Sequence, residues 1–114
     1  MILKNKRPWG YFEILSDAPD YKVKRIVVEP GGILSLQRHK QRSEHWFVIA
    51  GSGVAIVDGK KKSLRTGSSL DIPKAAKHRV QNSSDENLII IEVQTGEYFG
   101  EDDIERLEDK YGRV

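Results

Sequence analysis

The 114-residue sequence contains no cysteine and no long apolar run. Without cysteine the chain can form no disulfide, no thiolate metal site and no cysteine nucleophile, and this composition is typical of proteins in reducing compartments. No segment approaches the roughly 18 consecutive apolar residues that a membrane-spanning helix needs. Residues 1–11 also lack the apolar stretch of a secretory signal peptide. We therefore expect a cytoplasmic protein with no membrane partner.

The chain also has little excess charge of either sign. There are 19 lysines and arginines and 17 acidic residues, which gives a formal net charge of +2. The densest basic cluster, residues 60–62, follows Asp58 and Gly59, and we predict that it forms a solvated hairpin tip. A nucleic-acid-binding face would need more charge on one side and interleaved aromatic residues, so we expect no nucleic-acid partner.

Short runs of alternating apolar and polar residues, separated by glycine and proline, fill most of the chain. Such runs are typical of half-buried β-strands. They predict an all-β fold, a small antiparallel β-barrel or jelly roll. Because no linker or internal repeat interrupts the pattern, we expect residues 1–114 to form a single domain. The predicted strands are residues 11–15, 21–29, 33–39, 44–49, 54–57, 62–65, 69–72, 78–82 and 88–94.

The end of the chain has a different pattern. Ile104, Leu107 and Tyr111 recur at helical spacing, with charged residues between them. Acidic residues gather at the start of this segment, where the helix dipole favours them, and Gly112 is suited to ending a helix. We therefore predict a C-terminal α-helix over residues 101–111.

Four polar residues have the spacing of a metal site. Gln37 and His39 are two residues apart on a predicted strand, so their side chains point to the same face. Glu44 begins the next strand and His78 begins a later one, and an antiparallel barrel can bring these strands together. Two imidazole nitrogens and two oxygens suit zinc, iron, manganese, cobalt or nickel. His45 has the opposite parity to Glu44 and is left out. Each residue taken alone is more typical of an ordinary surface or core position, and only the joint spacing favours a site.

Two spaced sets of residues resemble the conserved motifs of the cupin superfamily. The first set is Gly32, Gln37, His39, Glu44 and Gly51. The second set is Gly67, Pro73, Ala75, His78 and Asn82. The sequence departs from the usual motifs twice, with Gln37 in place of a first histidine and Ala75 in place of a glycine. The glutamine is informative, because phosphomannose isomerases use a Gln, His, Glu, His set to bind zinc.

A closer likeness is carried by residues 7–11, 21–26, 34–39, 42–46, 72–73, 78–79, 91–104 and 108–113. Through these segments the chain resembles, over nearly its whole length, the type II mannose-6-phosphate isomerase domain. That domain is usually the C-terminal cupin of a bifunctional enzyme whose other part is a mannose-1-phosphate guanylyltransferase. The glycine-rich nucleotide-binding start of the guanylyltransferase is absent here, so we do not expect this chain to make GDP-mannose itself.

The resemblance implies a metal-dependent isomerase that interconverts mannose 6-phosphate and fructose 6-phosphate and feeds GDP-mannose and polysaccharide synthesis. It also implies a small sugar phosphate as the partner. One divalent ion is expected on the four candidate ligands, zinc first, with cobalt, manganese, nickel or iron as alternatives. The open-chain sugar would lose a proton from C2, pass through a cis-enediol and regain a proton at C1. Glu92 is the candidate base if it faces inward, and a metal-bound hydroxide is the alternative.

Basic residues near the predicted ligands are candidates for contacting the substrate phosphate. We expect Arg42 and Arg79 to bind the phosphate, with Arg79 also in the catalytic set. Lys24 and Arg25 have opposite parity on their strand, so only one of them can face a cavity. Trp46 shares the parity of Glu44 and is expected to pack at the floor of the pocket.

Three other interpretations remain open. The chain could be a different metal-dependent cupin enzyme, a non-catalytic module that binds metal or sugar phosphate beside a separate guanylyltransferase, or a barrel without metal. Gln37 argues against the first, because oxygenase and decarboxylase cupins commonly carry three histidines and one glutamate. We also expect a homodimer, since cupins of this size commonly pair and residues 9–15 are apolar enough to serve as an exposed sheet edge.

Overall fold

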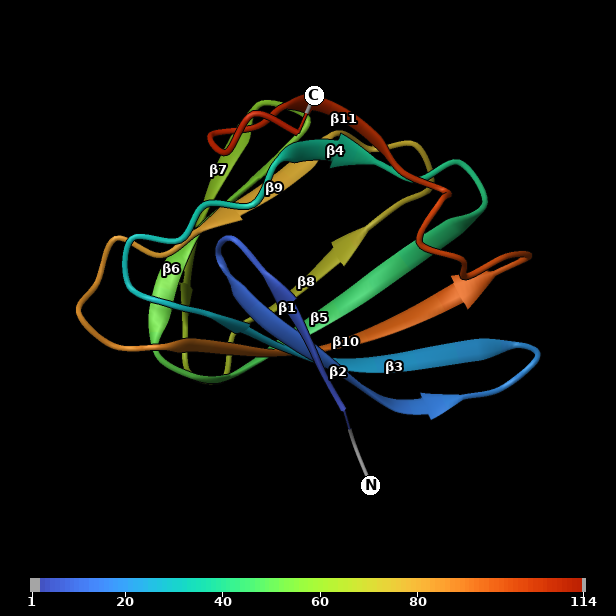
Figure 1. The fold of residues 1–114 in the computed structure, drawn as a ribbon, viewed down its shortest axis with the longest axis horizontal. Coiled ribbons are helices and arrows are strands. Elements are labelled where there is room, and N and C mark those ends of the chain that lie inside the picture. Colours follow the sequence, from blue (N-terminus) through green and yellow to red (C-terminus); the bar gives the residue numbers. More distant parts are fainter. Residues whose placement is uncertain (1–2, 114) are drawn as a thin grey trace.

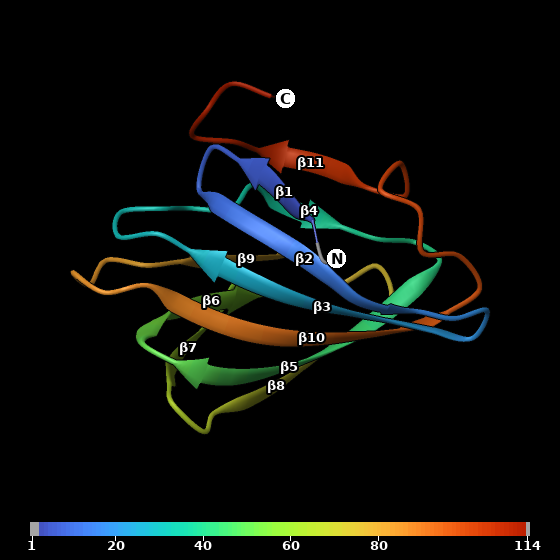
Figure 2. The same cartoon turned by 60° about the horizontal axis from the view of Figure 1, so that its bottom comes forward.

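The computed structural model describes residues 3–113, which form two antiparallel β-sheets packed face to face (Figure 1, Figure 2). The strand order is β1-β2-β3-β10-β5-β8 in the larger sheet and β11-β4-β9-β6-β7 in the smaller one. The predicted all-β architecture is therefore confirmed. The larger sheet contains β1 (Lys4–Arg7), β2 (Gly10–Asp17), β3 (Tyr21–Val28), β10 (Leu88–Gly96), β5 (Arg42–Ala50) and β8 (Ser69–Ile72). The smaller sheet contains β11 (Glu105–Glu108), β4 (Leu36–Arg38), β9 (His78–Gln81), β6 (Ser52–Val57) and β7 (Lys60–Arg65).

The side chains between the sheets change from apolar to polar along the strands of the larger sheet. On β10, Ile90 lies opposite Ile26 of β3, and both are buried. Two residues further along, Glu92 lies opposite Lys24, and the next inward residue is Gln94; these three are buried as well. Burying charged groups costs free energy unless they are paired. The apolar end therefore holds the sheets together, and the polar end forms a site.

Two tight turns position the strands that surround this polar end. Asp58 and Gly59 have φ values of 47° and 81° and join β6 to β7, as expected for a two-residue hairpin turn. Ala75 has a φ of 65°, in the left-handed region that glycine adopts most easily. The Ala75 N–H donates to the His39 carbonyl at 2.8 Å, which ties the turn before β9 to the residue after β4.

The predicted C-terminal helix over residues 101–111 is wrong. The described part of the chain contains no helix at all, so it has none that could cross a membrane. The segment forms turns and the strand β11, which pairs antiparallel with β4. Without β11, β4 would present an unpaired edge. The backbone ladder between the two strands and an ion pair between Arg38 and Glu105 at 3.0 Å favour the strand over the helix that the local spacing suggests.

The expected free edge over residues 9–15 is also wrong. Most of this segment lies in β2, which pairs with β3 on one side and with β1 on the other. The edge strand is β1, which sequence patterning missed because its four residues, Lys-Asn-Lys-Arg, show no apolar alternation. The homodimer therefore stays a prediction, and residues 9–15 no longer indicate which sheet edge would form its interface.

Candidate metal centre

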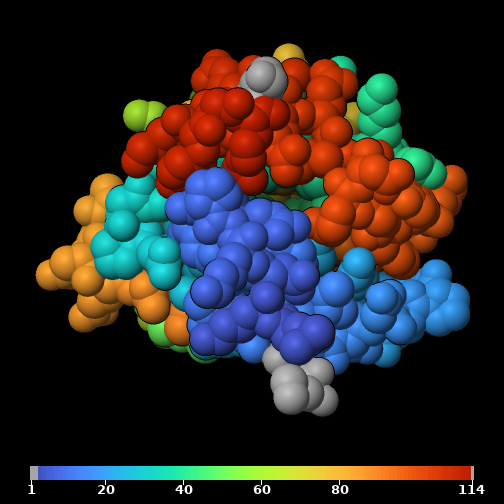
Figure 3. All heavy atoms as spheres, in the orientation of Figure 1, coloured from blue at the N-terminus to red at the C-terminus, as the bar shows by residue number. Residues whose placement is uncertain are grey.

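A cavity lies at the polar end of the sandwich. Residues from both sheets and from both ends of the chain line it. In the space-filling view the C-terminal segment lies against the N-terminal strands, with a hollow between them (Figure 3). The polar residues of its lining are Arg7, Lys24, Ser35, Gln37, His39, Arg42, Glu44, His78, Glu92, Glu101, Arg106 and Arg113.

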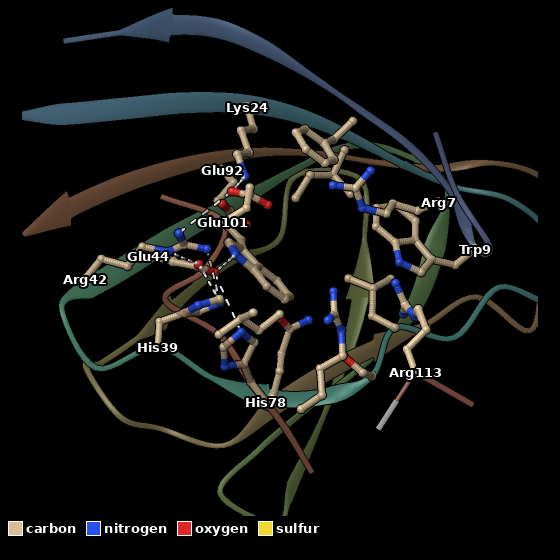
Figure 4. A pocket seen from close by; sticks show the side chains of 18 residues that line it. Arg7, Trp9, Lys24, His39, Arg42, Glu44, His78, Glu92, Glu101 and Arg113 are labelled. Atoms are coloured by element: carbon tan, nitrogen blue, oxygen red, sulfur yellow. Dashed lines mark hydrogen bonds and ion pairs between the residues drawn. The ribbon is translucent and has the colours of Figure 1, made fainter. Parts of the chain in front are cut away.

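Three of the predicted ligands meet in this cavity. His39 follows β4, Glu44 lies on β5 and His78 begins β9, and all three are buried. The His39 Nε2 atom lies 3.4 Å from one Glu44 carboxylate oxygen, and the His78 Nε2 atom lies 3.8 Å from the other. One ligand atom from each residue falls within 4.8 Å of the others, so the three side chains could hold one metal ion (Figure 4).

The two imidazoles are oriented by backbone carbonyls. The His39 Nδ1 atom is 2.5 Å from the Asp103 carbonyl, and the His78 Nδ1 atom is 3.0 Å from the Ala76 carbonyl. A carbonyl can only accept, so each Nδ1 carries the proton and each Nε2 presents a lone pair. Burial together with the charge of Arg42 lowers the pKa of His39 to about 4, and burial also lowers the pKa of His78. Both rings are therefore neutral near pH 7, the form that binds a metal.

The Glu44 carboxylate is fixed by two donors from its own strand. The Trp46 indole N–H donates to one oxygen at 3.0 Å, and the Arg42 Nε–H donates to the other at 3.2 Å. Arg42 also reaches the His39 Nε2 atom at 3.2 Å, so a cation binding at that nitrogen would displace this hydrogen bond. Arg42 thus contacts two candidate ligands directly, and Trp46 lies in the cavity wall as expected.

Gln37, the fourth predicted ligand, lines the same cavity as the other three. It is on β4, where its backbone is in register with His78 of β9. The donor set of two imidazole nitrogens, one carboxylate and one amide oxygen suits a borderline divalent ion such as zinc. The residues present therefore fit the implied metal.

A second buried carboxylate faces the same space. Glu92 lies on β10 next to Trp46 of β5 and Lys24 of β3, and its side chain lines the cavity. Burial, and secondarily the charge of Glu44, raises the pKa of Glu92 to about 7. The Gln94 amide donates a hydrogen bond to its carboxylate. Glu92 therefore faces inward and can exchange a proton near neutral pH.

The C-terminal segment brings a third carboxylate over this group. Glu101 pairs with Lys24 at 2.5 Å and lies 4.0 Å from Arg42. Burial acts to raise the pKa of Glu101, but Lys24, through its charge and hydrogen bond, together with Arg42 and Lys22 outweighs it, and the pKa is lowered. Sequence reasoning missed Glu101, because it was assigned to a helix start rather than to the mouth of a cavity.

Several basic or histidine side chains point away from the cavity. The Arg79 guanidinium reaches Glu108 at 3.5 Å and does not line the cavity, so its expected catalytic and phosphate roles find no support in the geometry. Arg25 pairs with Glu13 at 2.7 Å, leaving Lys24 as the inward member of its pair. The last, His45, is exposed on the outer face, as its parity indicated.

Sequence comparison identifies relatives of this chain. A family model described as mannose-6-phosphate isomerase C-terminal matches residues 2–109. The alginate biosynthesis protein AlgA of Pseudomonas aeruginosa is 49% identical over 108 residues, which are 95% of this chain and 22% of AlgA. A mannose-1-phosphate guanylyltransferase of Klebsiella pneumoniae is 44% identical over 107 residues, 94% of this chain and 23% of that protein. The chain thus spans less than a quarter of the length of these relatives.

Structural comparison supports the fold. A cupin-2 domain protein of Rhodospirillum rubrum superposes with a TM-score of 0.74, over 90% of this chain and 77% of that one. The sequence identity across the superposition is 21%, so the likeness concerns the fold alone. The expected cupin architecture is therefore confirmed.

Proposed function

We propose that this chain, which belongs to the mannose-6-phosphate isomerase C-terminal family, is a metal-dependent isomerase that interconverts mannose 6-phosphate and fructose 6-phosphate. The observation that carries the proposal is the buried grouping of His39, Glu44 and His78 beside Glu92 in one cavity. The mannose 6-phosphate that such an isomerase makes would feed the synthesis of GDP-mannose and polysaccharides. The guanylyltransferase activity named for the longer relatives is not proposed for this chain.

The metal would be held by His39, Glu44 and His78, with Gln37 as a further oxygen donor. When bound, a divalent ion such as zinc supplies Lewis-acid stabilisation of the negative charge that develops on the sugar oxygens. The chain's own groups prepare the site, because the Nδ1 hydrogen bonds leave both Nε2 atoms aimed at Glu44. Arg42 and Trp46 act as positioning residues for the Glu44 carboxylate.

Glu92 is the proposed carrier of the proton. The isomerisation moves the C2 proton of the open-chain sugar to C1 and the C2 hydroxyl proton to the oxygen on C1. Glu92 can therefore accept the carbon-bound proton and return it without net change. A base works best when its pKa lies near the working pH, and that of Glu92 is about 7. Its burial against Trp46 also keeps the transferred proton away from bulk water.

The cavity also offers a polar group that a sugar could satisfy. The Ser35 hydroxyl is fully buried, lines the cavity and has no hydrogen-bond partner within residues 3–113. Buried hydroxyls without partners are uncommon in folded proteins, and each calls for an explanation. A hydroxyl group of the bound sugar would give the Ser35 hydroxyl its missing hydrogen-bond partner.

The test is an assay of mannose 6-phosphate conversion by the purified chain. The protein is assayed as isolated, after chelation, and after addition of zinc, cobalt or manganese, together with the variant His39→Ala. Turnover should vanish on chelation, return with metal and be absent in His39→Ala. The matched control is His45→Ala, which removes an exposed histidine on the outer face and should retain activity.

Two negative results of this assay have different meanings. If the folded, metal-loaded chain shows no turnover, the isomerase proposal is wrong for this chain. A metal-loaded chain that binds mannose 6-phosphate without converting it would instead fit a binding module acting beside a separate enzyme. Metal content and substrate binding, measured on the same preparation, separate these two results.

A further inference from the structure

Three arginines, Arg7, Arg106 and Arg113, line the same cavity as the predicted metal ligands. Arg7 ends β1, and Arg113 lies near the end of the described chain. Arg106 lies on β11, where its backbone is in register with Gln37 of β4. In the close-up view Arg7 and Arg113 face the open space from one side, and His39 and Glu44 face it from the other (Figure 4). The arginines come from opposite ends of the sequence and meet only in the folded structure.

These arginines carry more positive charge than the contacts around them offset. Arg113 is paired with Asp109 through two hydrogen bonds at 2.6 and 3.2 Å. The Arg7 guanidinium donates to the Lys6 carbonyl at 2.9 Å and lies over the Phe12 ring at 4.8 Å, neither of which neutralises its charge.

Arg106 is the least satisfied of the three. Its Nε atom is buried and finds no hydrogen-bond partner in the described part of the chain. Burial lowers the pKa of Arg106, and the neighbouring charges of Arg113 and Arg7 lower it further, while Asp109 and Glu101 act in the opposite direction. Like charges gathered at a cavity wall raise the free energy of the protein until an anion binds between them.

We propose that Arg7, Arg106 and Arg113 form the subsite that binds the phosphate group of the substrate. The inference rests on the proposed function, since it places one end of the same sugar phosphate. A guanidinium presents a planar fork of N–H donors that matches phosphate oxygens, and charge-assisted bonds of this kind are the strong ones. The dianionic phosphate would complete the hydrogen bonding of the buried Arg106 Nε.

The other cations of the cavity fit this task less well. Lys24 is paired with Glu101 at 2.5 Å, and Arg42 is bonded to Glu44 and His39. A phosphate on Arg42 would lie directly at the candidate metal ligands and would leave no place there for C1 and C2. With the phosphate at the arginine end, the reacting carbons of the sugar extend toward Glu92 and the metal ligands.

The arginine subsite takes two of its three side chains from the first and the last strands of the structure. Arg7 is supplied by the edge strand β1, and Arg106 by β11, the edge strand of the other sheet. Neither strand belongs to the apolar core, and each places one guanidinium at the cavity. Recognition of the phosphate therefore depends on the two edge strands, whereas the chemistry depends on the central strands.

The experiment compares Arg106→Gln and Arg7→Gln with wild type in the metal-loaded protein. Loss of one charge-assisted contact to the phosphate corresponds to a rise in KM for mannose 6-phosphate of about 10- to 100-fold. Metal content and kcat should change little, and competitive inhibition by inorganic phosphate should weaken in parallel. Arg65→Gln is the matched control, because Arg65 is exposed on β7 and is not among the residues that line the cavity.

Calorimetric binding keeps this test separate from the isomerase proposal. Binding of mannose 6-phosphate and of unphosphorylated mannose is measured for wild type, for each glutamine variant and for Arg106→Lys, which retains the charge. If wild type prefers the phosphorylated sugar, Arg106→Gln loses that preference and Arg106→Lys keeps part of it, the subsite stands even without turnover. If both glutamine variants, folded by circular dichroism, bind mannose 6-phosphate as tightly as wild type, the subsite is wrong whatever the turnover.

Discussion

The two ends of the cavity differ in how their polar groups are supported. At the metal-ligand end, His39, Glu44 and His78 each receive or donate at least one hydrogen bond within the protein. At the arginine end, the Arg106 Nε has no such partner within residues 3–113, and Arg7 and Arg106 come from edge strands. A preorganised set of ligands can hold an ion with little rearrangement, whereas an under-neutralised cluster gains most when an anion arrives.

The comparison predicts that substitutions at the two ends of the cavity change different properties of the protein. Changes at the metal-ligand end should lower metal affinity and kcat, and changes at the arginine end should raise KM for the phosphorylated sugar. The four predictions that follow probe the first of these ends, from the largest expected effect to the smallest.

Replacement of Glu44 by glutamine should have the largest effect. It keeps the shape of the side chain but removes a carboxylate. The other predicted ligands, Gln37, His39 and His78, offer none. Loss of a charged ligand is worth several kcal/mol, so metal affinity should fall by about 1,000-fold and turnover with it. Metal titration of the chelated protein measures the change. Unaltered affinity in the variant would remove Glu44 from the ligand set.

Replacement of Glu92 by glutamine should separate chemistry from metal binding. The variant lacks the proposed proton carrier, so kcat should fall by about 100-fold, the lower end of the range for a general base. Metal content should match wild type, because Glu92 is not among the predicted ligands. Normal turnover in Glu92→Gln would assign proton transfer to another group.

The pH dependence of stability in the metal-free protein should show two opposing contributions. His39 has a pKa of about 4 against an ordinary 6.5, so the unfolded chain binds more protons between these values and stability falls as pH drops below 6.5. The pKa of Glu92 is about 7 against an ordinary 4.5, so the folded chain binds more protons there and stability falls as pH rises from 4.5 to 7.

Glu92→Gln removes the glutamate contribution and leaves that of the two buried histidines, His39 and His78. Between pH 6.5 and pH 5 the variant should lose about 2 kcal/mol of unfolding free energy from His39, and His78 adds to this loss because its pKa is also lowered. Wild type should change less over the same range. Urea unfolding at the two pH values, with chelator present, measures the difference. Equal slopes in wild type and variant would contradict the opposite protonation of these two groups.

Replacement of Trp46 by phenylalanine should have the smallest effect of the four. The ring volume is partly retained, but the indole N–H that donates to Glu44 at 3.0 Å is lost. Changes to groups that orient metal ligands typically cost 10- to 100-fold, and Arg42 still holds the other carboxylate oxygen, so about a tenfold loss of metal affinity is expected. A variant with wild-type affinity would show that Arg42 alone is sufficient.

The sheets and the metal-ligand end were largely accessible to sequence reasoning. Strand parity places Glu44 and Trp46 on the inner face of β5 and His45 on the outer face, as the structure does. Turn chemistry likewise predicted the hairpin at Asp58 and Gly59. These predictions succeed because alternation and turn preference are local properties of the chain.

The arginine end was not accessible in the same way. Arg106 lies in a segment whose apolar residues have helical spacing, and only pairing with β4 makes that segment a strand. Arg7 lies in a short polar strand without alternation. Arg79 was expected at the phosphate because it follows His78, yet adjacent residues on a strand point to opposite faces. Long-range pairing, which single-sequence patterns do not contain, decides which cations reach the cavity.

The most direct measurement concerns the orientation of the bound sugar between the two ends. With Mn²⁺ or Co²⁺ in the protein, paramagnetic relaxation reports how far the phosphorus and the C2 proton of bound mannose 6-phosphate lie from the metal. The account predicts that C2 lies closer to the metal and that the phosphate lies outside the coordination sphere, beside Arg7 and Arg106. A phosphate bound directly to the metal would contradict it.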